Sequence, residues 1–222
     1  MPDSSLNMDL AQPVAIDAET VEWAPSPLPG VDRRRLEREA AEHGRATSIV
    51  RYAAGASFSQ HLHPAGEEYL VLDGTFSDGD GDFSAGFYVR NPPGSRHAPF
   101  SRPGCTLFVK LCQMQPGEPH VAVDTRAGRW QPGRCAGHEV LALYAGEAET
   151  VALERLAPGT DLGEEAGHGG LEILVLDGVL TVDGVPRGRH TWLRVPADTG
   201  VALASGTGAA WWAKRGHLPG RG

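Results

Sequence analysis

Two histidines separated by one residue, His61 and His63, precede a pair of glutamates, Glu67 and Glu68, in the segment HLHPAGEEYLVLDG. In an extended strand alternate side chains face the same side, so His61 and His63 point together, and Glu67 joins them if the backbone stays extended. His97, which ends the segment NPPGSRH, can approach from a second strand. Three imidazoles and a carboxylate suit zinc, iron, manganese or nickel. The alternative interpretation is a surface histidine pair on a hairpin.

The segment that carries these residues occurs twice in the chain. EEYLVLDG at 67–74 is matched 104 positions later by LEILVLDG at 171–178, whereas the offset upstream is 107, and a three-residue insertion between the two registers explains the change. Because internal repeats mark repeated structural units, we predict two copies of one unit, residues 1–115 and 116–222. The gap-free register runs from Arg51 to Lys110, and matched pairs in the two registers include Gly55 and Gly159, Tyr88 and Trp192, Arg90 and Arg194, and Trp23 and Trp130.

Each copy consists of short β-branched and aromatic runs bounded by glycine, proline, aspartate or asparagine, a pattern typical of strands joined by turns. Examples are TSIVRYAAG, AGFYVRNPPG and CTLFVKLCQ. The segment VDRRRLEREAAEHG would also suit a helix, but its counterpart HEVLALYAGEAET indicates a strand and a turn, so we predict a strand in both. About 100 residues of short strands per copy predict an all-β fold, a sandwich or a small barrel.

The composition argues against several classes of partner. The formal net charge is −8, and no basic cluster combines with aromatic residues, so we expect neither nucleic acid nor an anionic membrane. The basic segment DRRRLER at 32–38 is interpreted as a solvated strand face or turn. No apolar run approaches the roughly 20 residues that span a bilayer, and the N-terminal segment lacks the features of a signal peptide. We therefore expect a soluble cytoplasmic protein.

The three cysteines, Cys105, Cys112 and Cys135, are odd in number and form no Cys-x-x-Cys. We therefore expect neither a disulfide framework nor a cysteine zinc site. Because a free cysteine behaves as a small hydrophobic residue, Cys105 and Cys112 are interpreted as thiols of the strand core. A redox role for Cys105 is the alternative.

The spacing around the histidines matches both signature motifs of the cupin superfamily. The matching residues are Gly55, His61, His63, Glu67 and Gly74 in the first motif and Gly86, Pro92, Gly94 and His97 in the second. The chain resembles ChrR-like cupins more closely still, through GEEYLVLDGTFSDGDGDF, YVRNPPGSRH and GCTLFVKL. Together with the repeat, the resemblance implies two tandem cupin barrels of the double-stranded β-helix, or jelly-roll, type.

The resemblance implies metal ligands at His61, His63, Glu67 and His97, with Glu68 as the alternative carboxylate. Strand alternation and the family spacing both favour Glu67. The expected cofactor is one divalent transition metal, zinc first, with iron, nickel and manganese as alternatives. Where the family pattern continues with an asparagine, this chain has Ser101, which is not a usual metal ligand.

In the second copy the four ligand positions are occupied by Glu165, Gly167, Leu171 and Val201. A glycine, a leucine and a valine cannot bind a cation through their side chains, so we predict a degenerate cupin that keeps the barrel without the metal ligands. Glu165 and His168 in a different site are the alternative, but two scattered polar residues are usually just solvated.

The resemblance implies a relative of the C-terminal domain of ChrR, a zinc-dependent anti-sigma factor that responds to reactive oxygen. In that family a separate N-terminal helical zinc domain with a Cys-x-x-Cys binds the sigma factor. This chain shows no such segment, so we do not expect direct sigma-factor binding. The resemblance favours a regulatory or sensor protein over an enzyme. The alternative is a metal-dependent cupin dioxygenase or isomerase that acts on a small organic substrate, for which the sequence assigns no catalytic residue.

The expected partner at the metal is a small-molecule ligand or a reactive oxygen species. A lone cupin barrel usually hides one sheet by pairing with another barrel. We therefore expect the two copies to form an intramolecular pseudo-dimer, with a homodimer of whole chains as the alternative.

Overall fold

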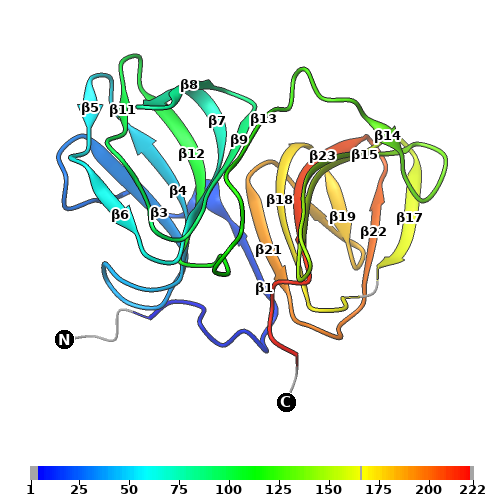
Figure 1. The fold of residues 1–222 in the computed structure, drawn as a ribbon. Coiled ribbons are helices and arrows are strands. Elements are labelled where there is room, and N and C mark those ends of the chain that lie inside the picture. The colour runs from blue at the N-terminus through cyan, green and yellow to red at the C-terminus, as the bar shows by residue number, and fades with distance from the viewer. Residues whose placement is uncertain (1–4, 166, 221–222) are drawn as a thin grey trace. The chain divides into compact units, whose positions relative to one another are not determined.

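The computed structural model describes residues 5–165 and 167–220, and within them it is built from strands, with one three-residue 3₁₀ turn, η1 (Ala18–Thr20). The predicted all-β class is confirmed. The chain divides into two compact units (Figure 1). The described residues up to Met8 and Val21–Ala127 form the first unit, and Asp9–Thr20 with the described residues from Gly128 onward form the second.

The main sheet of the first unit has the strand order β13-β9-β7-β12-β4-β3-β2. Its strands are β2 (Ala24–Pro25), β3 (Val31–Arg38), β4 (Ala46–Tyr52), β7 (Glu67–Asp78), β9 (Phe87–Asn91), β12 (Cys105–Leu111) and β13 (Val121–Asp124). Three short strands attach to it, β5 (Ala56–Ser57), β8 (Gly81–Ser84) and β11 (Phe100–Ser101). A separate antiparallel pair consists of β6 (His61–His63) and β10 (Ser95–His97).

The second unit repeats this strand order as β1-β21-β18-β23-β16-β15-β14. Its strands are β1 (Val14–Asp17), β14 (Gln131–Pro132), β15 (His138–Ala145), β16 (Thr150–Leu156), β18 (Leu171–Gly178), β21 (Thr191–Val195) and β23 (Ala209–Arg215). A second sheet contains β17 (Thr160–Glu165), β22 (Val201–Ser205), β19 (Leu180–Val182) and β20 (Val185–Arg187). The repeat in the sequence is therefore also a repeat of strand order.

Strand β3 contains the basic segment that would also suit a helix. It pairs antiparallel with β4, so the prediction of a strand is confirmed. The interpretation of this segment as a solvated face is wrong for Arg33 and Arg38. Their side chains are only 12% and 5% exposed, respectively, and both line a cavity of the first unit.

The LVLDG sequence that both copies retain serves the fold. The pairing of β7 with β12 skips Leu72, and Gly74 follows with a φ of 72°. A Cβ on Gly74 would lie 2.1 Å from the carbonyl oxygen of Gly104, and in the second unit a Cβ on Gly178 would lie 2.2 Å from that of Gly208. Because any side chain would clash there, both bulges require glycine whether or not a metal site is present.

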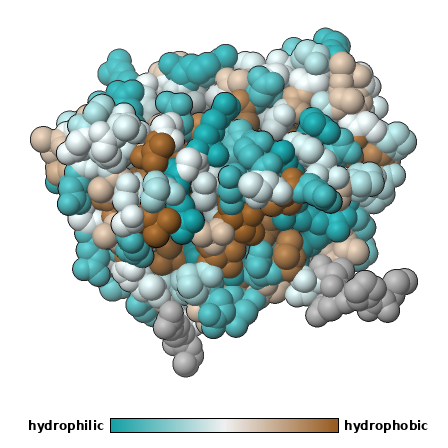
Figure 2. Space-filling view, turned by 180° about the vertical axis from the view of Figure 1, so that it is seen from behind, coloured by the Kyte–Doolittle hydropathy of each residue, from teal (hydrophilic) through white to brown (hydrophobic). Residues whose placement is uncertain are grey.

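Each unit encloses a hydrophobic core of its own. On the face of the molecule in Figure 2, hydrophilic residues lie among smaller hydrophobic areas. No helix in the described part of the chain is long and apolar enough to cross a membrane. The first core includes Tyr69, Val71, Phe76, Val89 and Leu107, and the second includes Leu171, Ile173, Leu193, Leu203 and Trp211.

Strands β1 and β13 occupy equivalent places in the two sheets (Figure 1). Strand β1 lies in the first copy of the repeat but joins the second sheet, and β13 lies in the second copy but joins the first sheet. Their sequences, VAID and VAVD, are related by the offset of 107. Val14 of β1 pairs with Arg194, and Val121 of β13 pairs with the matching Arg90. The N-terminal strand thus completes the second sheet, and the strand after the first copy completes the first. The division of the chain into a first copy, residues 1–115, and a second copy, residues 116–222, stays a prediction from the repeat in the sequence.

A fragment of residues 1–115 keeps β1 but loses β13, and this leaves one edge of β9 unpaired. We expect the fragment to dimerise with β1 of each copy on β9 of the other, because an unpaired edge recruits a further strand. Residues 21–127 keep β13 and lack β1, so this control fragment should be monomeric. Light scattering after size-exclusion chromatography measures both masses, and a monomeric 1–115 fragment would contradict the expectation.

Candidate metal centre

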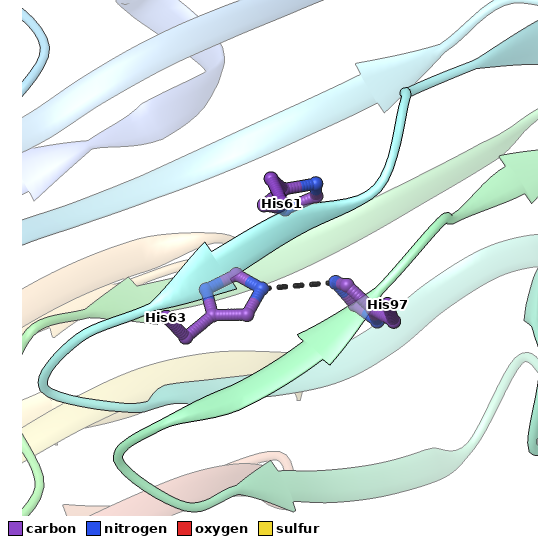
Figure 3. Close-up of side chains that lie close together, drawn as sticks. All are labelled: His61, His63 and His97. Atoms are coloured by element: carbon purple, nitrogen blue, oxygen red, sulfur yellow. Dashed lines mark hydrogen bonds between the residues drawn. The ribbon is translucent and has the colours of Figure 1, made fainter.

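The antiparallel pair of β6 and β10 brings three histidines together (Figure 3). His61 and His63 lie on β6, and His97 on β10 pairs directly opposite His61. Strand alternation turns Leu62 outward, where it is 45% exposed, whereas His63 and His97 are 6% and 7% exposed. The predicted common orientation of the two histidines in His-x-His is therefore present in the structure.

The three imidazole rings converge on one point. Their available ring nitrogens lie within 4.8 Å of one another, and no other described group of three or more histidine, cysteine or acidic side chains has this geometry. The Nε2 atoms of His63 and His97 are 3.0 Å apart (Figure 3). Two buried imidazole nitrogens at this distance need a shared proton or a cation between them. The donor set thus fits a single transition metal.

Glu67 borders this cluster. Its Oε2 atom lies 3.6 Å from Nε2 of His63 and 3.4 Å from Nε2 of His97. The side-chain amide of Asn91 donates a hydrogen bond of 3.1 Å to the same oxygen. Glu67 is 8% exposed, and a carboxylate buried to this degree requires such partners. Its position is that of a fourth donor beside the three imidazoles.

Glu68, the alternative carboxylate, is engaged away from the cluster. It accepts a hydrogen bond of 2.7 Å from the Tyr88 hydroxyl and one of 3.3 Å from Arg90. In the second unit Glu172 accepts a hydrogen bond of 2.7 Å from the indole nitrogen of Trp192. Because the matching glutamate has a matching partner in the unit without the histidines, this position serves the fold.

Asp78 is the residue that the sequence analysis missed. It lies at the end of β7, in a segment that forms the β7–β8 hairpin, and acidic residues are common in turns for reasons of local structure. Its Oδ2 atom is 2.9 Å from Nδ1 of His97. The Nδ1–H group of His97 donates to this carboxylate, so Nε2 faces the cluster. Metal-binding histidines usually have such a partner on the second nitrogen.

The two buried histidines have pKa values shifted in opposite directions. Burial lowers the pKa of His63, and the charges of His97 and His61 add to this effect against that of Glu67. Burial also acts to lower the pKa of His97, but the hydrogen bond to Asp78 and the charge of Glu67 outweigh it and raise the pKa above its usual value. A metal ion must therefore displace a proton more often at His97 than at His63.

Ser101 is explained by the fold. Its hydroxyl donates a hydrogen bond of 2.6 Å to the carbonyl oxygen of Thr75. The hydroxyl of Ser205 donates an equivalent bond of 2.7 Å to the carbonyl oxygen of Val179 in the second unit. Since the bond recurs where the histidines do not, Ser101 has a structural role.

The ligand positions of the second unit are occupied in other ways. Leu171 and Val201 belong to its hydrophobic core, and a Cβ on Gly167 would clash with a backbone carbonyl. Glu165 forms an ion pair with Arg215 and lies 3.6 Å from Arg134. Among the described residues, Glu165 and His168 do not belong to any group of side chains that could hold a metal.

A cavity of about 640 Å³ opens beside the histidines and is lined by His61, His63 and Glu67. Its size falls within the range of small-molecule sites. Most of its remaining wall is apolar and comes from Val31, Val50, Tyr52, Phe58, Phe76, Leu107, Val109 and Leu111.

The second unit places polar and charged side chains where the first has cavity walls. The matched pairs are Val31 with His138, Val50 with Glu154, Leu111 with Arg215 and His61 with Glu165. His138 lies 3.1 Å from Glu154, which is 2.5 Å from Arg215, and Arg215 also pairs with Glu165. His138 and Glu154 are only 4% and 3% exposed. A buried ion-pair network therefore occupies positions that surround open space in the first unit.

Residues 11–115 match the family model of the ChrR cupin-like domain. The match includes all three histidines and Glu67. Over this range the chain is similar to a ChrR cupin-like domain. No curated protein sequence matches the chain.

Solved structures share the fold over most of the chain. A "putative dioxygenase" of Nostoc punctiforme is 16% identical with a TM-score of 0.78, and 94% of this chain aligns with 84% of that one. Protein YlbA of E. coli is 15% identical with a TM-score of 0.74, covering 99% and 97% of the two chains. Oxalate decarboxylase of Bacillus subtilis, which has Mn(II) centres, is 13% identical with a TM-score of 0.66, covering 93% and 78%.

The purified chain should bind one transition-metal ion, and Asp78→Ala should weaken zinc binding about 10- to 100-fold, because His97 loses the hydrogen-bond acceptor that orients its ring. His97→Ala should abolish stoichiometric binding. Elemental analysis and competition with a chelating dye measure these effects. His168→Ala is the matched control and should change nothing. Two ions per chain, or full occupancy in His97→Ala, would place the site elsewhere.

Cys105 should be unreactive in the folded protein. Its side chain is 4% exposed, and burial raises the pKa of the thiol to about 11, so at about pH 8 roughly one thiol in a thousand is ionised. A disulfide reagent should therefore modify Cys105 only after unfolding, as mass spectrometry of the labelled peptides would show. Rapid labelling of Cys105 in the native chain would restore the redox alternative.

Proposed function

We propose that the first unit binds one divalent transition metal through His61, His63, Glu67 and His97, and that a small organic molecule reacts at this metal from the adjoining cavity. The cavity carries the proposal. A metal held only for structural reasons needs no mostly apolar space of about 640 Å³ beside its ligands, whereas a substrate does. The sequence resemblance alone favours a sensor over an enzyme, and because of the cavity we favour the enzyme over the sensor.

The side chains around the cluster have separate tasks in this proposal. Asp78 holds His97 with Nε2 toward the metal position, and Asn91 fixes one oxygen of Glu67. His63 and Glu67 face the cavity, so a substrate placed there reaches the open side of the site. When bound, an iron, nickel or manganese ion with four protein ligands leaves two positions for Lewis-acid or oxygen chemistry. The apolar walls exclude water from the reacting group.

The shared fold supports metal-dependent chemistry as the broad class, and within it we favour the dioxygenase over the isomerase. One structural neighbour is a "putative dioxygenase", and another is a decarboxylase with Mn(II) centres. Since these proteins are at most 16% identical to this chain, they support the kind of chemistry and carry no information about the substrate.

A zinc-dependent sensor is the second candidate, and the match of residues 11–115 to the ChrR cupin-like family favours it. Zinc held by His61, His63, Glu67 and His97 would have all four positions of its usual shell filled by the protein. In this case the protein responds to reactive oxygen by losing a ligand and releasing the ion. Cys105 is too deeply buried to supply the reactive group, whereas His61, His63 and Glu67 line the cavity, where reactive oxygen can reach them.

We further propose that the second unit is a degenerate cupin barrel, so that the chain contains two tandem barrels arranged as an intramolecular pseudo-dimer. The common strand order of the two main sheets supports a second barrel, and the pseudo-dimer stays a prediction. The ion-pair network of the second unit supports a structural rather than a catalytic role for it.

Loading the apoprotein separately with Fe(II), Mn(II), Ni(II) and Zn(II) separates the two candidates. We expect oxygen consumption or product formation in at least one form, at about 1 per second or faster, with a panel of small diketones, flavonols and organic acids. Val50→Phe should retain the metal and lose this activity, because the larger side chain fills the cavity. Val185→Phe, at an exposed position of the second unit, is the matched control.

One result of the same experiment would favour the sensor over the enzyme. Zinc release under singlet oxygen, without turnover in any metal form, would overturn the enzyme and support the sensor.

A further inference from the structure

Two arginines of β3 share a single carboxylate at the wall of the cavity. Arg33, Arg38 and Glu42 all line it. The guanidinium of Arg33 donates two hydrogen bonds, of 3.1 and 2.9 Å, to the two oxygens of Glu42. Arg38 lies 3.7 Å from the same carboxylate. Both arginine side chains are nearly buried, whereas Glu42 is 42% exposed. Two guanidinium groups and one carboxylate leave these three residues with one positive charge in excess.

The three residues belong to the copy that has the histidines. Arg33 and Arg38 are matched by Val140 and Ala145 in β15, which has no cationic pair at these positions. Glu42 lies in the connection between β3 and β4, residues 39–45, and the corresponding connection between β15 and β16 is three residues shorter. The insertion detected in the sequence therefore builds the loop that presents Glu42 to the cavity.

The pairing with Glu42 leaves room for a stronger partner. Burial lowers the pKa of Arg38, and the nearby charge of Arg33 adds to this effect, which Glu42 offsets only in part. The Nε–H group of Arg33 is buried and has no hydrogen-bond partner. Because the Glu42 side chain is 42% exposed, an anion from solution can reach this edge and compete with that carboxylate for the two guanidinium groups.

We propose that the molecule bound in the cavity is an organic acid, with an apolar body against the cavity walls and a carboxylate on Arg33 and Arg38 in place of Glu42. A planar guanidinium binds a carboxylate through two parallel hydrogen bonds, as Glu42 itself demonstrates. The inference rests on the proposed function in one respect, namely that the cavity beside the histidines is the substrate site. The loop at 39–45 is then displaced when the acid binds.

The test measures binding to the metal-free full-length chain by calorimetry, with phenylacetate, phenylbutyrate and octanoate as probes and their amides as neutral controls. We expect at least one acid to bind about tenfold or more tightly than its amide, because hydrogen bonds between charged groups are the stronger ones. Arg33→Gln and Arg38→Gln should each remove this preference.

Glu42→Ala provides a change in the opposite direction. Removal of the internal competitor should tighten acid binding severalfold, since the loop carboxylate acts at high effective concentration. The variant keeps both arginines, so it remains informative even if an arginine variant fails to fold. Arg126→Gln is the matched control: Arg126 also holds a carboxylate through two hydrogen bonds, that of Asp124, but does not line the cavity.

Equal affinity for acids and amides, no binding of any acid, or unchanged affinity in Arg33→Gln would overturn the inference. Metal content, measured separately on the same preparations, distinguishes this failure from that of the proposed function. Acid binding by a chain that cannot retain metal would refute the metal site alone. Metal binding without any preference for acids would refute the organic acid alone.

Discussion

The antiparallel pairing of β6 with β10 is the constraint on which the site depends. This two-stranded pair places His97 opposite His61 and, through strand alternation, turns His63 to the same side. Burying imidazoles this close together is unfavourable unless each ring has a partner. Asp78 supplies one at Nδ1 of His97, and Glu67 stands beside the other nitrogen. The site therefore requires residues from β6, β7 and β10. Strands β6 and β7 are neighbours in the sequence, whereas His97 of β10 lies 34 residues beyond His63 and meets it only in the folded unit.

The two copies solve the same packing problem in different ways. Both need the glycine of LVLDG and the hydroxyl that closes the adjoining turn, because these belong to the backbone geometry. Inside, the first unit keeps apolar walls around open space, whereas the second introduces His138, Glu154 and Arg215 and pairs them with one another. A buried charge is tolerated only when paired, so these substitutions depend on each other. A chain that lost the histidines alone would have kept an empty cavity.

Strand periodicity made part of the site predictable and hid the rest. A period of two residues places His61 and His63 on one face of β6 and sends Glu67 and Glu68 of β7 to opposite faces, which requires only local geometry. The backbone does not stay extended between them, because the chain turns after His63 before β7 begins at Glu67, so Glu67 reaches the histidines from a separate strand. Asp78 and the arginines of β3 could not be assigned in this way, because their roles depend on which face of a distant strand borders the cavity. The exchange of β1 and β13 was also missed. The matching sequences VAID and VAVD identify equivalent strands but do not say with which copy each one pairs.

The balance of charge around the cavity indicates how a ligand is oriented. A divalent ion beside Glu67 and Asp78, with three neutral imidazoles, has its two positive charges matched by two carboxylates. At another polar part of the wall, Arg33 and Arg38 share one carboxylate, that of Glu42, and Arg38 also donates a hydrogen bond of 2.7 Å to the carbonyl oxygen of Ala41. The uncompensated charge of the cavity thus lies with the arginines rather than at the metal position. Electrostatic attraction in a site of low dielectric is strongest where charge is unmatched. In the proposed complex, an anionic group is drawn toward β3 and its loop, which leaves the uncharged end of the molecule to face the histidines.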